Sequence, residues 1–307
     1  MAGKTLVESR RRGPTGDREQ TAQRLLRSTA ARSYDPELEI DWSVPPVPGL
    51  DFVLEERCSL YGTALWRSLS AEQRLELGRH EAASVASVGV WFEVMLMRML
   101  TKLAYEGDAT TRHVQYAFAE VADECRHSTM FARMIEWMGA PAYGPPSAVH
   151  RRGRALPHVA HGPAMWGAIL IGEEVVDRFQ REMVDDERIQ PLMRMVNRIH
   201  IVEEARHVSF ARAELLRTVE ATPRWELPYH RLLLAYVAYI ACRSLINPRA
   251  YAAVGLDPRE ARRAALGNPY HQDTIRFGGE KIMPFLTEAG LVGEPGMRFW
   301  RQSFLVG

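Results

Sequence analysis

Residues 123–127 read Asp-Glu-Cys-Arg-His, and residues 203–207 read Glu-Glu-Ala-Arg-His. Both segments follow one pattern: an acidic residue, Glu, any residue, Arg, His. Each lies in the middle of a long stretch whose apolar spacing predicts a helix. Because positions three apart on a helix share a face, each segment directs one carboxylate and one imidazole toward the same point. This repeat predicts the fold and the site together.

Two further glutamates stand at matching distances before the repeat. Glu93 lies 31 residues before Glu124, and Glu173 lies 31 residues before Glu204. In an antiparallel helix pair, residues equidistant from the turn lie at one height, so four helices bring these carboxylates to one level. Buried together, they repel one another unless cations neutralise them. We therefore expect two metal ions, iron or manganese, with the ligands Glu93, Glu124, His127, Glu173, Glu204 and His207.

Other side chains near the repeat have expected supporting roles. His200 lies four residues before Glu204, on the same helical face, and is expected as a third imidazole ligand. Glu174 is an alternative to Glu173. Asp123 and Glu203 are placed to accept a hydrogen bond from the outer N–H of a ligand histidine, that of the opposite motif. The charge-balancing residues are Arg126 and Arg206.

The surrounding pattern predicts an all-α chain with a four-helix core over residues 70–221. Ser70, with Gln73 three residues on, predicts a helix start. The proline- and glycine-rich residues 139–163 are expected to form a long crossover loop. Residues 1–48 are expected to be a loose arm or surface wrap, and 49–307 a single helical domain. The expected helices are 70–105, 110–138, 163–184, 191–221, 226–246, 257–266 and 270–289.

Composition limits the class of protein. The 307 residues carry a net charge of +1, which does not suggest binding to nucleic acid or to a membrane. No fully apolar run is long enough to span a bilayer. Arg10, Arg11 and Arg12 precede no apolar segment, so we expect no export and a cytoplasmic location. Three scattered cysteines exclude a disulfide framework and a thiolate metal cage.

The paired motifs resemble those of the ferritin-like di-iron carboxylate proteins. With His200 added, the chain is similar to the arylamine N-oxygenases of the AurF type over about residues 75–220. Glu173, His200, Glu204 and His207 reproduce that family's intervals in the second half. The first half has a somewhat shorter interval before its motif than the family, so Glu81 is the alternative to Glu93.

The resemblance implies a ferritin-like bundle with an N-terminal arm and additional C-terminal helices. It implies two iron ions that use O2 as co-substrate, and a small-molecule amine oxidised to a hydroxylamine, nitroso or nitro product in secondary metabolism. It also implies an external electron donor, a reductase or ferredoxin. The residues one turn from the ligands are expected to line the substrate pocket: Gly89, Val90, Met97, Trp166, Ile169, Leu170 and Val196.

Three further expectations concern substrate, assembly and alternatives. No Arg lies one turn from Glu93 or Glu173 to hold an acid group, so p-aminobenzoate is not the expected substrate. A homodimer is expected from apolar surface such as Tyr236, Tyr239 and Trp300. A di-iron C–H hydroxylase or desaturase shares the other ligands, and a site without the third histidine would favour it. Phe131, at the position of a radical-forming Tyr, argues against a reductase subunit.

Overall fold

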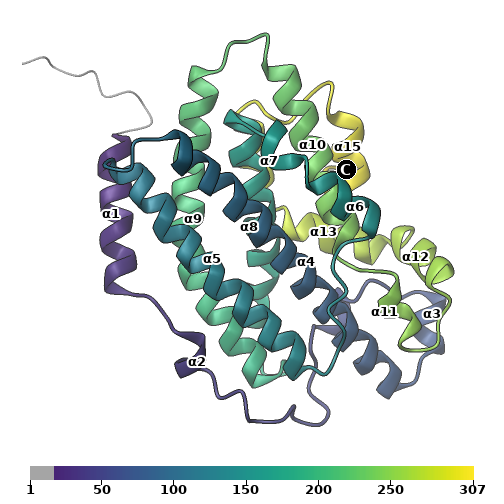
Figure 1. Ribbon diagram of the computed structural model, residues 1–307. Helices are drawn as coiled ribbons and strands as arrows, with labels where there is room; N and C mark the ends of the chain where they lie inside the picture. The colour runs from purple at the N-terminus through teal and green to yellow at the C-terminus, as the bar shows by residue number, and fades with distance from the viewer. Residues whose placement is uncertain (1–16) are drawn as a thin grey trace, which may run out of the picture.

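The computed structural model describes residues 17–307. In this part of the chain, helices are joined by loops. A single bridge, between Asp51 and Ile189, is the only β-type pairing in the described part of the chain. Four long helices form the centre of the molecule (Figure 1). They are α4 (Ala71–Glu106), α5 (Arg112–Trp137), α8 (Gly162–Met183) and α9 (Pro191–Ala221). The expected all-α fold class is confirmed.

Local sequence sets the ends of these helices. Ser70 caps α4 by accepting from the backbone N–H of Gln73, whose side chain accepts in return from the N–H of Ser70. Thr111 accepts from the N–H of Val114 at the start of α5. Pro191 is the first residue of α9, where its missing N–H is not needed. The helices therefore begin close to the residues that the sequence predicts.

The segment between the two helix pairs differs from the expected long loop. It contains two short helices, α6 (Ser147–Gly153) and α7 (Leu156–Val159). Gly153 lies directly against the ring of Trp91, at a distance that a Cβ atom could not occupy. Packing of this small residue on α4 explains why a segment rich in helix breakers is ordered against the bundle.

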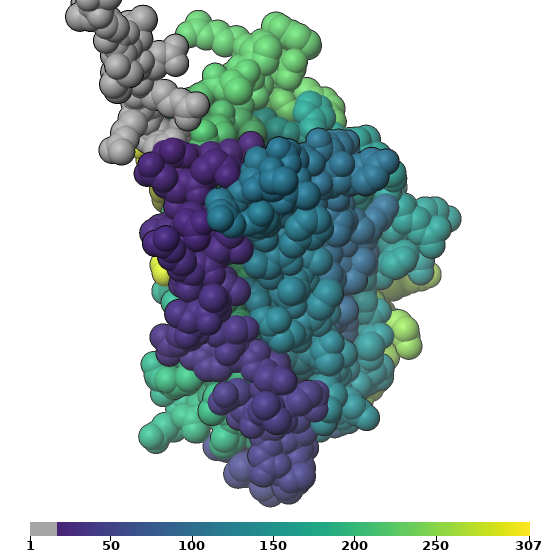
Figure 2. Space-filling model, turned by 60° about the vertical axis from the view of Figure 1, so that its left-hand side comes forward, coloured from purple at the N-terminus to yellow at the C-terminus, as the bar shows by residue number. Residues whose placement is uncertain are grey.

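The described part of the expected arm, residues 17–48, packs on the bundle. It forms α1 (Arg18–Ala31) and α2 (Pro36–Glu39), and α1 lies along α5 and α9 (Figure 2). Ala22 and Leu25 of α1 are buried in the main core. The segment Arg10–Arg12, which led us to expect no export, lies outside the described residues.

The C-terminal region adds a layer beside α8. The expected helix over 270–289 is divided at Gly279, so it forms two helices instead of one. A short 3-10 helix (Glu55–Arg57) and α3 (Ala64–Ser68) precede the bundle. The added helices are α10 (Leu227–Ser244), α11 (Arg249–Ala252), α12 (Pro258–Leu266), α13 (Pro269–Gly278), α14 (Ile282–Glu288) and α15 (Met297–Ser303).

The apolar surface expected to support a dimer is used inside the chain. Trp300 is fully buried, and Tyr236 and Tyr239 pack against Phe299 of α15. This corrects the expectation for Trp300, because the C-terminal layer folds back and covers it. The homodimer itself stays a prediction.

Among the described residues, helix α4 is by length and composition long and apolar enough to cross a membrane. However, 61% of its most apolar 18-residue segment is buried inside the structure. That is the pattern of a core helix in a soluble protein, since bilayer-facing residues would be exposed here.

Candidate metal centre

Seven carboxylate and imidazole side chains meet in the middle of the four-helix bundle. All are buried, and their ligand atoms form overlapping groups that lie within 4.8 Å of one another. Helix α4 contributes one of them, α5 two, α8 one and α9 three. They are Glu93, Glu124, His127, Glu173, His200, Glu204 and His207.

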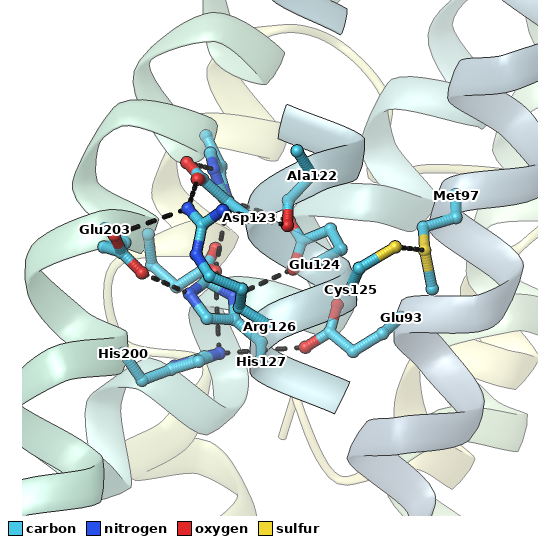
Figure 3. Close-up of polar contacts among 12 residues, drawn as sticks. Glu93, Met97, Ala122, Asp123, Glu124, Cys125, Arg126, His127, His200 and Glu203 are labelled. Carbon is cyan, nitrogen blue, oxygen red and sulfur yellow. Dashed lines mark hydrogen bonds and ion pairs between the residues drawn. The ribbon is translucent and has the colours of Figure 1, made fainter. Parts of the chain in front are cut away.

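The two motif histidines point the same nitrogen inward. His127 Nδ1 lies 2.9 Å from Glu124 and 3.1 Å from Glu204. His207 Nδ1 lies 2.8 Å from Glu124 and 3.1 Å from Glu204. Each imidazole therefore faces both motif glutamates. Figure 3 shows Glu124 beside His127.

The outer nitrogen of each histidine contacts the acidic residue of the other motif. His127 Nε2 lies 2.9 Å from Glu203, and His207 Nε2 lies 3.1 Å from Asp123. These contacts fix the ring orientation and direct Nδ1 at the cluster, where a neutral ring that donates through Nε2 would offer Nδ1 to a metal ion. They cross from α5 to α9 in both directions, which is the pairing expected from the sequence.

Two arginines cover this outer layer. Arg126 contacts Asp123 and donates to Ser33 Oγ at 2.9 Å. Arg206 lies 3.2 Å from Asp123 and 3.5 Å from Glu203. The arm closes the layer, because the backbone N–H of Tyr34 donates to Glu203 at 3.1 Å.

His200 lies inside the cluster. Its Nε2 is 3.5 Å from Glu204 and 3.7 Å from Glu93, both too long for a hydrogen bond. Its Nδ1 lies 2.7 Å from the side-chain oxygen of Gln180, which holds the ring with Nε2 directed at the carboxylates. His200 is therefore positioned like the motif histidines, with one nitrogen anchored and the other turned inward.

The alternatives that the sequence left open lie outside the cluster. Glu174 pairs with Arg212, whose Nε donates to it at 2.8 Å. Glu81 accepts from the backbone N–H of Ser59 at 2.9 Å, three turns along α4 from Glu93. Neither belongs to the groups of mutually close ligand atoms among the described residues.

Without metal ions the cluster is balanced by protons: against the effect of burial, the neighbouring carboxylates raise the pKa values of His127 and His207 well above their ordinary range. Burial raises the pKa values of Glu93 and Glu173 well above their ordinary range, and the charges of Glu124 and Glu204 raise them further. One oxygen each of Glu93 and Glu204, together with His200 Nε2, has no hydrogen-bond partner. Unpartnered oxygen and nitrogen atoms directed at one point are what two iron or manganese ions require. The residues fit a two-metal centre.

A cavity of about 120 Å³ lies beside the cluster, on the far side of the residues that contact His200. Phe131 and Gln180 form part of its wall, and the Phe131 ring lies 4.8 Å from the ring of His200. Most of the remaining wall is apolar, with Val85, Ala86 and Gly89 from α4.

Of the seven expected pocket residues, Gly89 lines this cavity. Trp166, Ile169 and Leu170 instead belong to the main core, where α8 faces the C-terminal layer. Val90 and Val196 pack in a second core at the other end of the bundle. Met97 lies 3.5 Å from the sulfur of Cys125, on the side of α5 away from the cluster (Figure 3). Ile169 also lines a small pocket together with the cluster residue Glu173. The expectation that these seven residues line the substrate pocket stays a prediction.

Three residues of the site were not found from the sequence. Gln180 and Asn197 lie at equal distances from the α8–α9 turn, so the spacing that pairs Glu173 with Glu204 could have located them. Glu120, one turn before Glu124, is fully buried with neither oxygen hydrogen-bonded. Burial raises its pKa well above the ordinary value.

A four-helix bundle with paired Glu-x-x-His motifs, a glutamate from each partner helix and a third buried histidine defines a ferritin-like di-metal carboxylate protein of the oxidase and oxygenase type. The family model "P-aminobenzoate N-oxygenase AurF" matches residues 15–290. The chain belongs to this family, and it is a non-haem di-iron enzyme.

Similar chains were found among curated proteins and among solved structures. The uncharacterized protein MT0908 of Mycobacterium tuberculosis (strain CDC 1551 / Oshkosh) is 29% identical over 293 residues, covering 90% of this chain and 84% of the relative. The uncharacterized protein Mb0909 of Mycobacterium bovis is 28% identical, with the same coverage. Two R2-like ligand-binding oxidases with Mn/Fe cofactors are each 14% identical. Their TM-scores are 0.49 (92% of this chain, 94% of that chain) and 0.45 (95% and 92%).

Proposed function

We propose that the protein is a di-iron oxygenase that oxidises the nitrogen of a small aromatic amine. The observation that carries this proposal is the position of His200, whose Nε2 faces Glu93 and Glu204 in a buried cluster with two other histidines. A third imidazole is the feature that separates the N-oxygenase ligand set from that of the C–H oxidising enzymes. Membership of the AurF family supports the same assignment.

The proposed ligands are the seven clustered residues. Glu124 and Glu204, each close to both motif histidines, would help these histidines to hold the two ions. When bound, the ions supply the electrons and Lewis acidity that reduce O2. The protein holds the imidazoles in one tautomer through Asp123 and Glu203, and the buried setting keeps water out.

The proposed overall reaction balances with an external donor. The amine N–H becomes N–OH, so one atom of O2 enters the product. The second oxygen atom leaves as water, which requires two electrons and two protons. The electrons come from a reductase or ferredoxin class of partner, and repeated cycles give nitroso and nitro products.

The test uses purified protein loaded anaerobically with Fe²⁺. We expect about two iron ions per chain. On addition of isotopically labelled O2, a reductant and 4-methylaniline, we expect labelled 4-methylphenylhydroxylamine or its nitroso product by mass spectrometry. Manganese loading in parallel identifies the active metal.

The probe separates the two candidate activities, because 4-methylaniline offers both an amine and a benzylic carbon. Label in 4-aminobenzyl alcohol would establish a C–H hydroxylase and overturn N-oxidation. If the purified protein bound no iron, both the N-oxidation and the C–H hydroxylation hypotheses would be ruled out. His200→Ala is the matched variant: the proposal requires loss of N-oxidation with the helical content retained.

A further inference from the structure

The cavity beside the metal cluster carries charges that limit its occupant. Its lining includes two carboxylates and one guanidinium among the residues of α4, α8 and the 3-10 helix. Arg57 donates to Glu182 through two nitrogens, at 2.8 and 2.7 Å, so its charge is already neutralised. The same guanidinium lies 3.9 Å from the centre of the Phe277 ring. The lining therefore contains no unpaired cation.

The other polar groups of the wall are neutral or anionic. Burial lowers the pKa of His271 to about 4, with Arg243 adding to the effect, so this imidazole is neutral at pH 7. Glu81 also lines the cavity; burial raises its pKa to about 7, and both of its oxygens accept hydrogen bonds from Ser59. The side-chain nitrogen of Asn197, one turn before His200, is buried and has no partner. This amide is a neutral group available to a ligand.

The size of the cavity also limits the occupant. Its volume is about 120 Å³. A dry apolar cavity of roughly 150 Å³ accommodates benzene. The small residues Ala82, Ala86 and Gly89 leave this space along one face of α4. The space is therefore of the order of a single small ring and is too small for a fused-ring system.

We infer that the substrate is an uncharged single-ring amine without a carboxylate, held by neutral contacts in this cavity. The inference rests on the proposed function and narrows its substrate class. It separates this chain from the substrate in the family's description, p-aminobenzoate, because the cavity offers a buried carboxylate no free cation to balance it.

The test compares two near-isosteric probes, 4-aminobenzamide and 4-aminobenzoate. Binding to the iron-loaded protein is measured by calorimetry under nitrogen, at neutral pH and without a reductant. We expect the amide to bind at least about tenfold more tightly than the carboxylate. Equal affinity, tighter binding of the carboxylate, or no binding of either probe overturns the inference.

Variants show whether the cavity charges cause this preference. Glu182→Gln releases the charge of Arg57, so it should strengthen binding of 4-aminobenzoate about fivefold or more and leave the amide unchanged. Glu187→Gln removes an equal charge from the exposed α8–α9 loop and should change neither. Gly89→Leu should abolish binding of both probes by filling the space. An unchanged carboxylate affinity in Glu182→Gln contradicts the charge argument.

The binding test and the test of the proposed function can fail separately. Iron content and the position of the oxygen label decide whether the protein is an N-oxygenase. The binding preference decides only which amines it accepts, and tighter binding of 4-aminobenzoate would leave N-oxidation intact.

Discussion

Each inward-facing imidazole of the cluster is fixed by a contact on its far side. Glu203 holds His127, Asp123 holds His207 and Gln180 holds His200. Such outer contacts set the tautomer of the ring and its direction. The arrangement of the cluster thus depends on side chains that do not face the metal position.

The neighbouring pair Glu173 and Glu174 gives a sharp test of the ligand set. Glu173→Ala should lower iron content by about one ion per chain, because it removes a carboxylate from the cluster. Glu174→Ala should keep both ions, because that side chain pairs with Arg212 instead. Iron is measured by atomic absorption after gel filtration. The opposite result would exchange the roles of the two residues.

Removing an outer contact should weaken metal binding without removing a ligand. Glu203→Ala leaves the outer nitrogen of His127 buried without a partner. We expect iron affinity to fall about 10- to 100-fold, measured by competition with a chromophoric chelator. Glu136→Ala, at an exposed position on the same helix as His127, is the control and should leave the affinity unchanged.

At the scale of helices, α1 ties the arm to both halves of the bundle. Arg18 donates to both oxygens of Glu214 on α9, at 3.1 and 2.9 Å, and contacts His113 of α5. Glu214 is buried, so this contact compensates a charge inside the protein. Helix α1 thereby spans the groove between α5 and α9, over the outer layer of the metal centre.

Loss of this contact should destabilise the protein. Arg18→Ala leaves Glu214 with Arg217 as its remaining cationic partner. We expect the free energy of unfolding in urea to fall by about 1–3 kcal/mol. Arg27→Ala removes an exposed arginine from the same helix and should change it by less than about 0.5 kcal/mol. Equal effects of the two variants would show that the ion pair contributes little.

The long helices and the cluster were predictable because their signals are local or periodic. Helical caps such as Ser70 and the two Glu-x-x-His segments need only neighbouring residues, and the matched spacing of Glu93 and Glu173 needs only a hairpin. The cavity was not predictable in this way. Its wall joins residues as distant in sequence as Phe52 and Ile275, whose meeting depends on the C-terminal layer. The burial of Trp300 depends on the same layer.

At the scale of the whole molecule, the metal centre lies where all four long helices meet, so metal binding and folding are coupled. In the metal-free protein protons offset the repulsion among the four buried carboxylates, as the raised pKa values of Glu93 and Glu173 indicate. Bound cations would replace these protons. A ligand present at 100 times its dissociation constant stabilises a folded protein by about 2.7 kcal/mol.

We therefore expect Fe²⁺ or Mn²⁺, added without oxygen, to raise the melting temperature by several degrees. Calorimetry with and without chelator measures this shift. The Glu124→Ala variant, which lacks a central carboxylate, should show a much smaller shift at the same metal concentration. If metal did not change the melting temperature of the unmodified protein, the predicted coupling between metal binding and folding would be wrong.

The reciprocal contacts between the two motifs have a consequence for how a cell makes this enzyme. Each motif's acidic residue supports the other motif's histidine, so neither hairpin contains a finished site of its own. A slip of one helix by a single turn, about 5.4 Å, would separate both pairs at once. A chain with this misalignment should therefore bind iron more weakly than the correctly assembled protein.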